Sequence, residues 1–253
     1  MSLSRPSKRG FSLIELMFSM AIGSIILILA ATLLGSSGES YERIGGSMAT
    51  EREARAVITQ LTSDLSAAKF YKDNLFEKSS STWPADRLGF LSLQPTQAQS
   101  ESGRIGDLCA VNYYIKDLSI GGKNVRCLMR GFRESKDTFK ALGDGTIPTL
   151  LAAVSDLDEP IAFGVVSFQV QPKYRDASGK WADWQKDDKP GPQALDTRLI
   201  LARRSLTGKL KTSADWDGAG TTGRLLGIPA EAGRNKEFEI YNALIEFGND
   251  ESP

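Results

Sequence analysis

Residues that commonly carry out catalysis are sparse in this chain. None of its 253 residues is histidine, which excludes a Ser-His-Asp triad, a Cys-His pair and any histidine-ligated metal site. Paired carboxylates can serve glycoside hydrolysis or bind calcium. Such acids occur at Asp156, Asp158 and Glu159 and at Asp187 and Asp188, without EF-hand spacing and beside proline, as in solvated turns. The sequence therefore predicts no catalytic residue, no metal site and no cofactor.

One further carboxylate, that of Glu15, lies in an otherwise uncharged apolar stretch. Glu15 is the only charged residue in the 24 residues from Phe11 to Leu34. Roughly 20 apolar residues suffice for a helix to cross a bilayer, and an acid inside such a helix costs on the order of 2.5–3.5 kcal/mol on insertion scales. Cleavage between Gly10 and Phe11 would create an amino group at Phe11. That group would pair with Glu15 in the same helix or in a stacked neighbour.

The ten residues before this stretch set its orientation. They contain Arg5, Lys8 and Arg9 and no acid, so the positive-inside rule keeps this end in the cytoplasm and exports the rest. An ordinary cleaved signal peptide fits poorly, because its apolar core is about 7–15 residues long and is followed by small residues at the cut. A plain signal anchor is the alternative interpretation.

The stretch KRGFSLIEL, residues 8–16, resembles the class III prepilin signal of type IV pilins and type II secretion pseudopilins. The matching features are a short basic leader, Gly10 before the cut, Phe11 after it and Glu15 at the fifth position of the mature chain. The resemblance implies that a prepilin peptidase cleaves between Gly10 and Phe11 and N-methylates Phe11. It also implies that Glu15 pairs with a chain terminus during assembly, and that the partners are other pilins or pseudopilins of the inner membrane.

The helix is expected to continue beyond the apolar span. Residues 35–47 are rich in glycine and serine, so we expect the helix to stop or loosen there. It resumes at Thr50, which forms a capping-box pattern with Glu53. Apolar residues then recur at helical spacing on one side, which predicts packing against a sheet: Ala54, Val57, Ile58, Leu61, Leu65 and Ala68.

After residue 73 the apolar periodicity changes to two, which predicts strands. Strands are expected at 87–93, 108–116, 124–132, 161–174 and 196–206, while 236–247 suits a strand or a helix. Residues 175–194 and 207–235 are expected to be loops. The predicted fold is α+β, with one long N-terminal helix carrying an antiparallel-sheet head. Its parts are a leader (1–10), a transmembrane helix (11–34), an amphipathic continuation (35–72) and an exported head (73–253).

The two cysteines, Cys109 and Cys127, lie in neighbouring predicted strands. A two-residue turn at Gly121 and Gly122 would place Cys109 opposite Glu134. A looser turn centred near residue 118 would place Cys109 opposite Cys127 and would give a coherent apolar face. We favour the looser turn, and export to an oxidising compartment then predicts a Cys109–Cys127 disulfide. Two separate buried thiols are the alternative.

Weaker resemblances narrow the family. Residues 58–69 and 150–184 resemble PilW-type minor pilins and the J-type pseudopilin. Residues 109–133 resemble prepilin-like Verru_Chthon cassette proteins. The Gly-rich region 205–235 and the C-terminus depart from the PilW pattern.

Lys+Arg and Asp+Glu both number 31, which disfavours a nucleic-acid partner. We therefore expect a non-enzymatic minor pilin, held in the inner membrane by a single pass with its head exported, and then built into a filament. The alternatives are a J-type pseudopilin of type II secretion and a membrane-anchored exported carboxylate enzyme.

Overall fold

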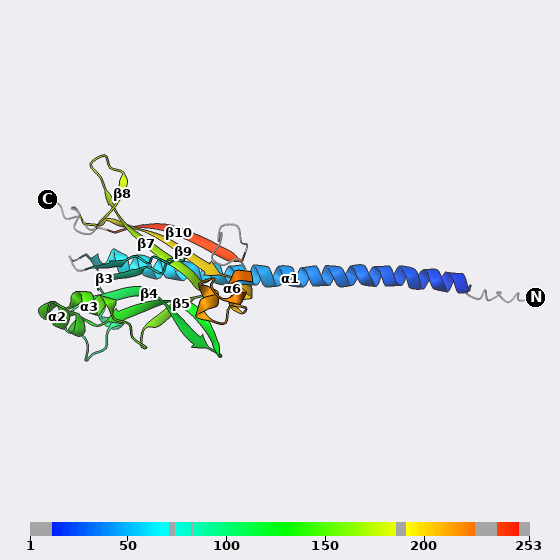
Figure 1. The fold of residues 1–253 in the computed structure, drawn as a ribbon, viewed down its shortest axis with the longest axis horizontal. Coiled ribbons are helices and arrows are strands. Elements are labelled where there is room, and N and C mark those ends of the chain that lie inside the picture. The colour runs from blue at the N-terminus through cyan, green and yellow to red at the C-terminus, as the bar shows by residue number, and fades with distance from the viewer. Residues whose placement is uncertain (1–11, 71–73, 82, 186–190, 226–236, 248–253) are drawn as a thin grey trace, which may run out of the picture. The chain divides into compact units, whose positions relative to one another are not determined.

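The computed structural model describes residues 12–70, 74–81, 83–185, 191–225 and 237–247 (Figure 1). The leader, with Gly10 and the following Phe11, lies outside the described residues. The chain divides into two compact units, Met1–Gly45 and Gly46–Pro253, and we call the second the head unit. The boundary expected between residues 72 and 73 stays a prediction, and the division into compact units falls earlier, after Gly45. The end of the long helix belongs to the head unit because its apolar side chains form part of that unit's core.

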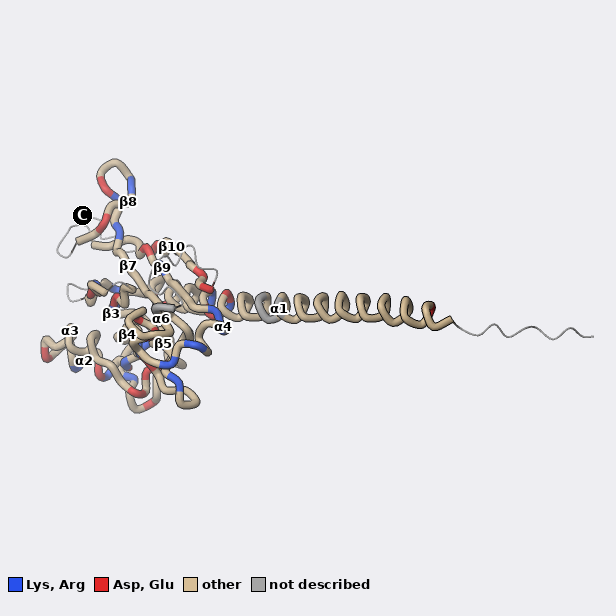
Figure 2. Tube along the Cα trace, turned by 45° about the vertical axis from the view of Figure 1, so that its right-hand side comes forward, with Lys and Arg blue, Asp and Glu red and all other residues tan. Residues whose placement is uncertain are grey.

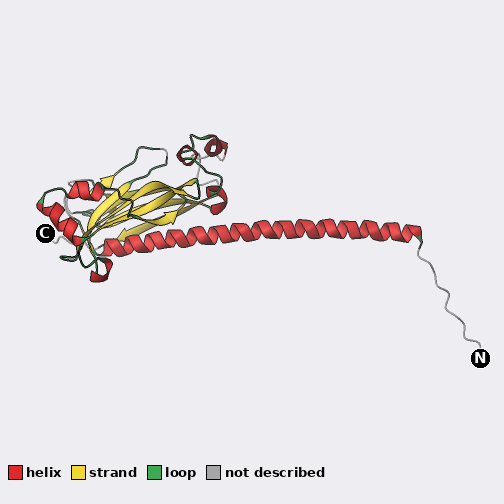
Figure 3. Cartoon of the chain, turned by 90° about the horizontal axis from the view of Figure 1, so that it is seen from below, coloured by secondary structure: helices red, strands yellow, loops and turns green. Residues whose placement is uncertain are grey.

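The helix α1 runs without interruption from Leu13 to Ser66 (Figure 3). The stop or loosening predicted for residues 35–47 does not occur, although each glycine there costs up to about 1 kcal/mol relative to alanine. The helix ends six residues before the predicted end at residue 72. It ends there because the chain turns into β1 (Ala68–Lys69), whose backbone pairs with β3.

A first antiparallel sheet contains six strands. They are β1, β2 (Leu75–Glu77), β3 (Arg87–Leu93), β4 (Leu108–Ile120), β5 (Lys123–Arg133) and β6 (Glu159–Phe163). The order is β1-β3-β4-β5-β6, and β2 pairs with β3 beyond the end of β1. The prediction of β3 is confirmed residue for residue.

A second antiparallel sheet has the order β10-β9-β7-β8. Its strands are β7 (Val165–Arg175), β8 (Trp181–Asp183), β9 (Ala194–Ala202) and β10 (Phe238–Glu246). The segment 236–247, which suited a strand or a helix, is thus a strand in its described part. Gly164 passes the chain from β6 to β7 with a φ of +73°. A side chain is excluded there, because a Cβ would lie 3.0 Å from the carbonyl oxygen of Ala202.

Short helices cover the ends of the sheets. The helices α2 (Ser135–Gly143) and α3 (Ile147–Ala152) pack near β4, and η1 (Thr96–Ala98) is a short 3₁₀ turn. The helices α4 (Arg204–Thr207), α5 (Ser213–Trp216) and α6 (Thr221–Leu225) lie near the other end of β4 and β5 (Figure 1). The predicted loop at 207–235 therefore contains helical turns in its described part, and the strand predicted at 196–206 ends at Ala202.

The main core lies where α1 passes between the two sheets. Most of the predicted apolar stripe is buried there, and it meets side chains from β3, β4 and β5 on one side and from β7, β9 and β10 on the other. Ile58 is only partly buried, and Ala68 is buried but belongs to β1. Burial of each large apolar side chain is worth about 1.5–3 kcal/mol. The fully buried members from α1 are Ala54, Val57, Leu61 and Leu65.

The β4–β5 hairpin has the register that we did not favour. Gly121 and Gly122 have φ values of +58° and +75°, which is the type I′ geometry of a two-residue turn. Ile120 therefore pairs with Lys123, and Lys116 lies opposite Cys127. Because strand residues alternate between faces, Cys109 and Cys127 lie on opposite faces of the sheet.

Both thiols are free and buried, so the predicted Cys109–Cys127 disulfide is wrong. The physical reason is that the two glycines accept the left-handed conformation that the tight turn requires. Both faces of this sheet are covered in the head unit, so a coherent apolar face did not discriminate between the registers.

Candidate processing and assembly site

The first described turn of α1 contains a capping box that our sequence analysis overlooked. The backbone N–H of Glu15 donates to Ser12 Oγ at 3.2 Å, and the backbone N–H of Ser12 donates to Glu15 Oε2 at 3.4 Å. This S-x-x-E pattern satisfies two of the free N–H groups at a helix start. Glu15 therefore has a local partner in its own chain, in addition to any partner that assembly supplies.

The helix that carries Glu15 has the length and composition of a membrane span. The span is Leu13–Gly38, and none of it is buried within the chain. Its large apolar side chains are exposed, from 55% for Ile22 to 77% for Leu13. Exposed apolar side chains on every side of a helix need lipid or other helices around them. Glu15 is the one acid that such surroundings would enclose.

A second acid in an apolar stripe fixes α1 within the head unit. Asp64, whose side chain is 1% exposed, accepts two hydrogen bonds from Arg130 of β5, at 2.7 Å to Oδ2 and 2.9 Å to Oδ1. The hydroxyl of Tyr113 on β4 donates to Asp64 Oδ2 at 2.5 Å. Tyr113 and Arg130 are directly opposed in the β4–β5 register. Sequence analysis missed this site, although an acid between Leu61 and Leu65 was a signal for it.

Electrostatics show how strongly these groups interact. Burial by itself would lower the pKa of Arg130, but its hydrogen bonds and charge interaction with Asp64 outweigh burial and raise that pKa. Burial and the nearby charge of Asp64 raise the pKa of Tyr113 well above its usual value. Tyr113 is therefore a neutral donor and Arg130 a permanent cation. The arrangement suits anchoring of α1 to β4 and β5.

A matching network lies on the opposite face of the first sheet. Arg133 contacts both oxygens of Asp158, at 2.5 and 3.1 Å, and the hydroxyl of Tyr114 donates to Asp158 Oδ2 at 2.8 Å. The backbone N–H of Ser155 donates to the same oxygen at 2.9 Å. Burial opposes ionisation of Asp158, but the hydrogen bonds from Arg133, Ser155 and Tyr114 lower its pKa. This network holds the loop before β6 against β4 and β5.

The carboxylate clusters are not arranged as catalytic pairs. Asp158 is engaged by Arg133, and Asp156 forms an exposed ion pair with Lys116 at 2.9 Å. Asp187 and Asp188 lie outside the described residues. Among the residues that the structure does describe, no three His, Cys, Asp or Glu side chains are grouped as metal ligands.

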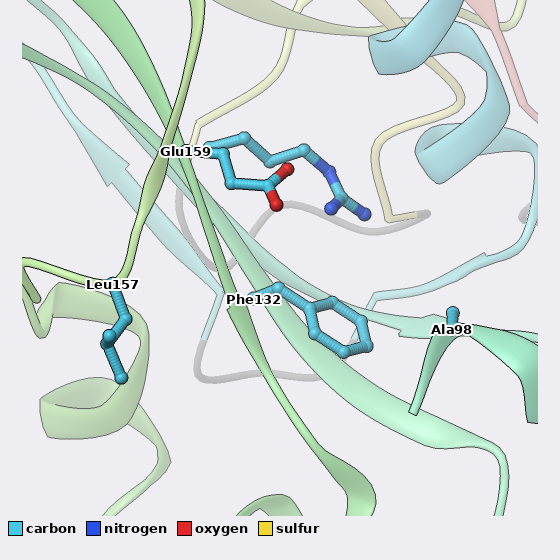
Figure 4. A pocket seen from close by; sticks show the side chains of 5 residues that line it. Ala98, Phe132, Leu157 and Glu159 are labelled. Atoms are coloured by element: carbon cyan, nitrogen blue, oxygen red, sulfur yellow. The ribbon is translucent and has the colours of Figure 1, made fainter. Parts of the chain in front are cut away.

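One shallow cavity of about 300 Å³ lies beside the Asp64 site. Phe132 and Glu159 line it from β5 and β6, with Leu157 and Ala98 around them (Figure 4). Arg130 also lines the cavity, but its guanidinium is held by Asp64. Glu159 is therefore the one carboxylate presented there, and a lone carboxylate without a second acid or a nucleophile does not form a hydrolytic site.

Comparisons with known proteins give a sequence motif and a structural likeness. Residues 5–31, which include Gly10, Phe11 and Glu15, match the family model of the prokaryotic N-terminal methylation motif. Curated proteins give no match. A solved structure of a type IV-like pilin from Thermus thermophilus is 15% identical, over 77% of this chain and 92% of that chain, with a TM-score of 0.34.

The molecule thus has a long apolar N-terminal helix followed by antiparallel sheets, an α+β architecture, and a methylation motif at the start of that helix. The methylation motif at the start of this helix supports the resemblance of the N-terminus to type IV pilin-like proteins. The apolar helix and the motif fit a membrane-anchored pilin.

Proposed function

We propose that the chain is a minor subunit of a type IV pilus-like filament and has no enzymatic activity. A prepilin peptidase cleaves between Gly10 and Phe11 and N-methylates Phe11. The subunit is held in the inner membrane by a single pass with its head exported, and is then built into the filament. The observation that carries this proposal is Glu15, an acid at the fifth mature position of an apolar helix within the methylation motif. The large head unit suits a tip or priming position.

The capping box makes the charge of Glu15 separable from its hydrogen bonds. Glutamine also closes a capping box, so Glu15→Gln keeps the cap and removes the charge. Ser12→Ala removes the cap, at a cost of about 0.5–2 kcal/mol of helix stability, and keeps the charge. If Glu15 pairs with the amino group of Phe11 in a neighbouring subunit, Glu15→Gln impairs incorporation and Ser12→Ala does not.

The experiment measures processing and incorporation in the same cells. Mass spectrometry of membrane-extracted protein should show a chain that begins at N-methylated Phe11, and Gly10→Val should leave the leader attached. The amount of each Glu15 and Ser12 variant in sheared filaments is then compared with its amount in the inner membrane. Normal incorporation of Glu15→Gln would contradict the charge role, and an uncleaved wild-type chain beside an active prepilin peptidase would contradict the whole proposal. Co-purifying subunits separate a pilus subunit from a J-type pseudopilin.

A further inference from the structure

One end of the head unit carries four exposed cations that have no acidic partner among the described residues. They are Lys123 at the tip of the β4–β5 hairpin, Arg204 in α4, and Lys209 and Lys211 between α4 and α5. Within the described part of the chain, none of their charged groups has a hydrogen-bond or ion-pair partner. Figure 2 shows these basic segments gathered beside α4 and β5.

The fold, and not sequence proximity, brings these cations together. The backbone N–H of Asn124 donates to the carbonyl of Lys211 at 3.3 Å, and Trp216 Nε1 donates to the carbonyl of Asn124 at 3.0 Å. Trp216 is fully buried, and Arg126 of β5 pairs with Asp217 at 2.8 Å. The hairpin tip and the segment from α4 to α5 are therefore held to each other by a buried aromatic side chain and an ion pair.

The head unit begins within α1, and the first residues of α1 in this unit lie at the same end. Ser47 Oγ donates to Glu239 Oε1 at 2.6 Å, and Arg203 Nε donates to the same oxygen at 2.9 Å. Arg204 directly follows Arg203, and Arg203 and Ser47 donate to the same oxygen of Glu239. Ser47 lies nine residues after Gly38, where the apolar span ends. Only a short stretch of chain therefore separates Ser47 from the end of the span.

The neighbouring acids are already engaged. Asp117 and Asp217 both pair with Arg126, and Glu239 pairs with Arg203. Asp215 is buried and accepts hydrogen bonds from backbone N–H groups and a threonine hydroxyl in its own loop. Lys123, Arg204, Lys209 and Lys211 are therefore the exposed charged side chains at this end that have no hydrogen-bond or ion-pair partner among the described residues.

We propose that this end of the head unit binds the anionic headgroups of the bilayer that anchors the chain. Basic residues near an anionic membrane surface gain about 1 kcal/mol each, an attraction that falls off within a Debye length of about 10 Å. The cluster requires no lipid of defined structure, only a surface of phosphate-bearing, negatively charged headgroups. The proposal rests on the membrane span and is independent of filament assembly.

The test uses the full chain in nanodiscs made of phosphatidylcholine alone or of phosphatidylcholine with phosphatidylglycerol. Hydrogen exchange of residues 120–124 and 203–212 should be slower in the anionic nanodiscs, and added salt should remove the difference. Native mass spectrometry in detergent gives the affinity for phosphatidylglycerol. The triple variant Lys123→Gln/Lys209→Gln/Lys211→Gln should lower the affinity for phosphatidylglycerol by up to about fivefold for each lysine replaced.

A matched variant controls for total charge. Lys69, Lys140 and Lys180 are also exposed, their ammonium groups have no ion-pair partner among the described residues, and they lie on β1, α2 and the β7–β8 turn. Replacing these three with glutamine should leave the affinity unchanged, and arginine in place of the three basic-end lysines should preserve it. Tryptophan fluorescence confirms that each variant is folded.

Two results would overturn the proposal. One is an equal affinity for phosphatidylglycerol in the wild type and the glutamine variant of the basic end. The other is a glutamine variant that still binds the lipid but loses co-purifying pilins, which would assign the surface to a protein partner. Leader cleavage and incorporation are measured separately, so failure here leaves the proposed function standing.

Discussion

The buried ion pair between Asp64 and Arg130 should be the most costly polar contact in the head unit to break. The Asp64 side chain is 1% exposed and the Arg130 side chain 14%, so neither charge is well solvated. Asp64→Asn keeps the shape and leaves the Arg130 guanidinium without its counter-charge. Removing one partner of a buried pair costs about 3–5 kcal/mol. Glu159, which lies opposite Arg130 in the β5–β6 register, partly compensates, so we expect about 3 kcal/mol.

That loss is large against a typical total stability of 5–15 kcal/mol. The chain's four tryptophans, at positions 83, 181, 184 and 216, all lie in the head unit, so urea unfolding followed by tryptophan fluorescence reports on this unit in the full chain. Tyr113→Phe removes one hydrogen bond to a charged group and should cost about 1.5–3 kcal/mol.

An exposed pair on the same helix is the matched control. Arg55 and Glu51 lie four residues apart at 2.7 Å, with side chains 75% and 47% exposed. Such helix pairs are worth about 0.3–0.5 kcal/mol, so Arg55→Gln should hardly shift the urea midpoint. A cost below 1 kcal/mol for Asp64→Asn, or one equal to that of Arg55→Gln, would refute the anchoring role of the buried pair.

Two other predictions concern acid stability and the thiols. Because the pKa of Asp158 is lowered in the fold, its contribution to the unfolding free energy is fully present above the unfolded pKa of about 3.9 and is lost as pH falls through the folded pKa. Asp158→Asn should therefore flatten the loss of unfolding free energy below about pH 4. An unchanged dependence of the unfolding free energy on pH would contradict this. Non-reducing peptide mapping after alkylation in denaturant should find both Cys109 and Cys127 as free thiols, because they lie on opposite faces of the sheet, and a Cys109–Cys127 peptide would refute the tight-turn register. Burial raises their pKa values to about 11 and 12, so both should react slowly with alkylating reagents in the native chain, as timed labelling would show.

Local patterns were sufficient where neighbouring residues decide the structure. The short apolar stretch Arg87–Leu93 predicted β3 with its bounds, and the strand buries five successive residues. The apolar span with Glu15 predicted the N-terminal part of α1 and the methylation motif, since both depend on contiguous residues. The capping box at Ser12 was equally local and was simply overlooked.

Long-range contacts decided the rest. Asp64 finds Arg130 66 residues later in the chain, and no local pattern specifies which strand residue will lie opposite a buried acid. The glycines of residues 35–47 predicted a break, yet the helix continues, because propensity is a weak preference that tertiary context overrides. The hairpin register followed the backbone geometry of Gly121 and Gly122, which accept positive φ. An apolar pattern on one face cannot determine register in a sheet that the fold covers on both faces.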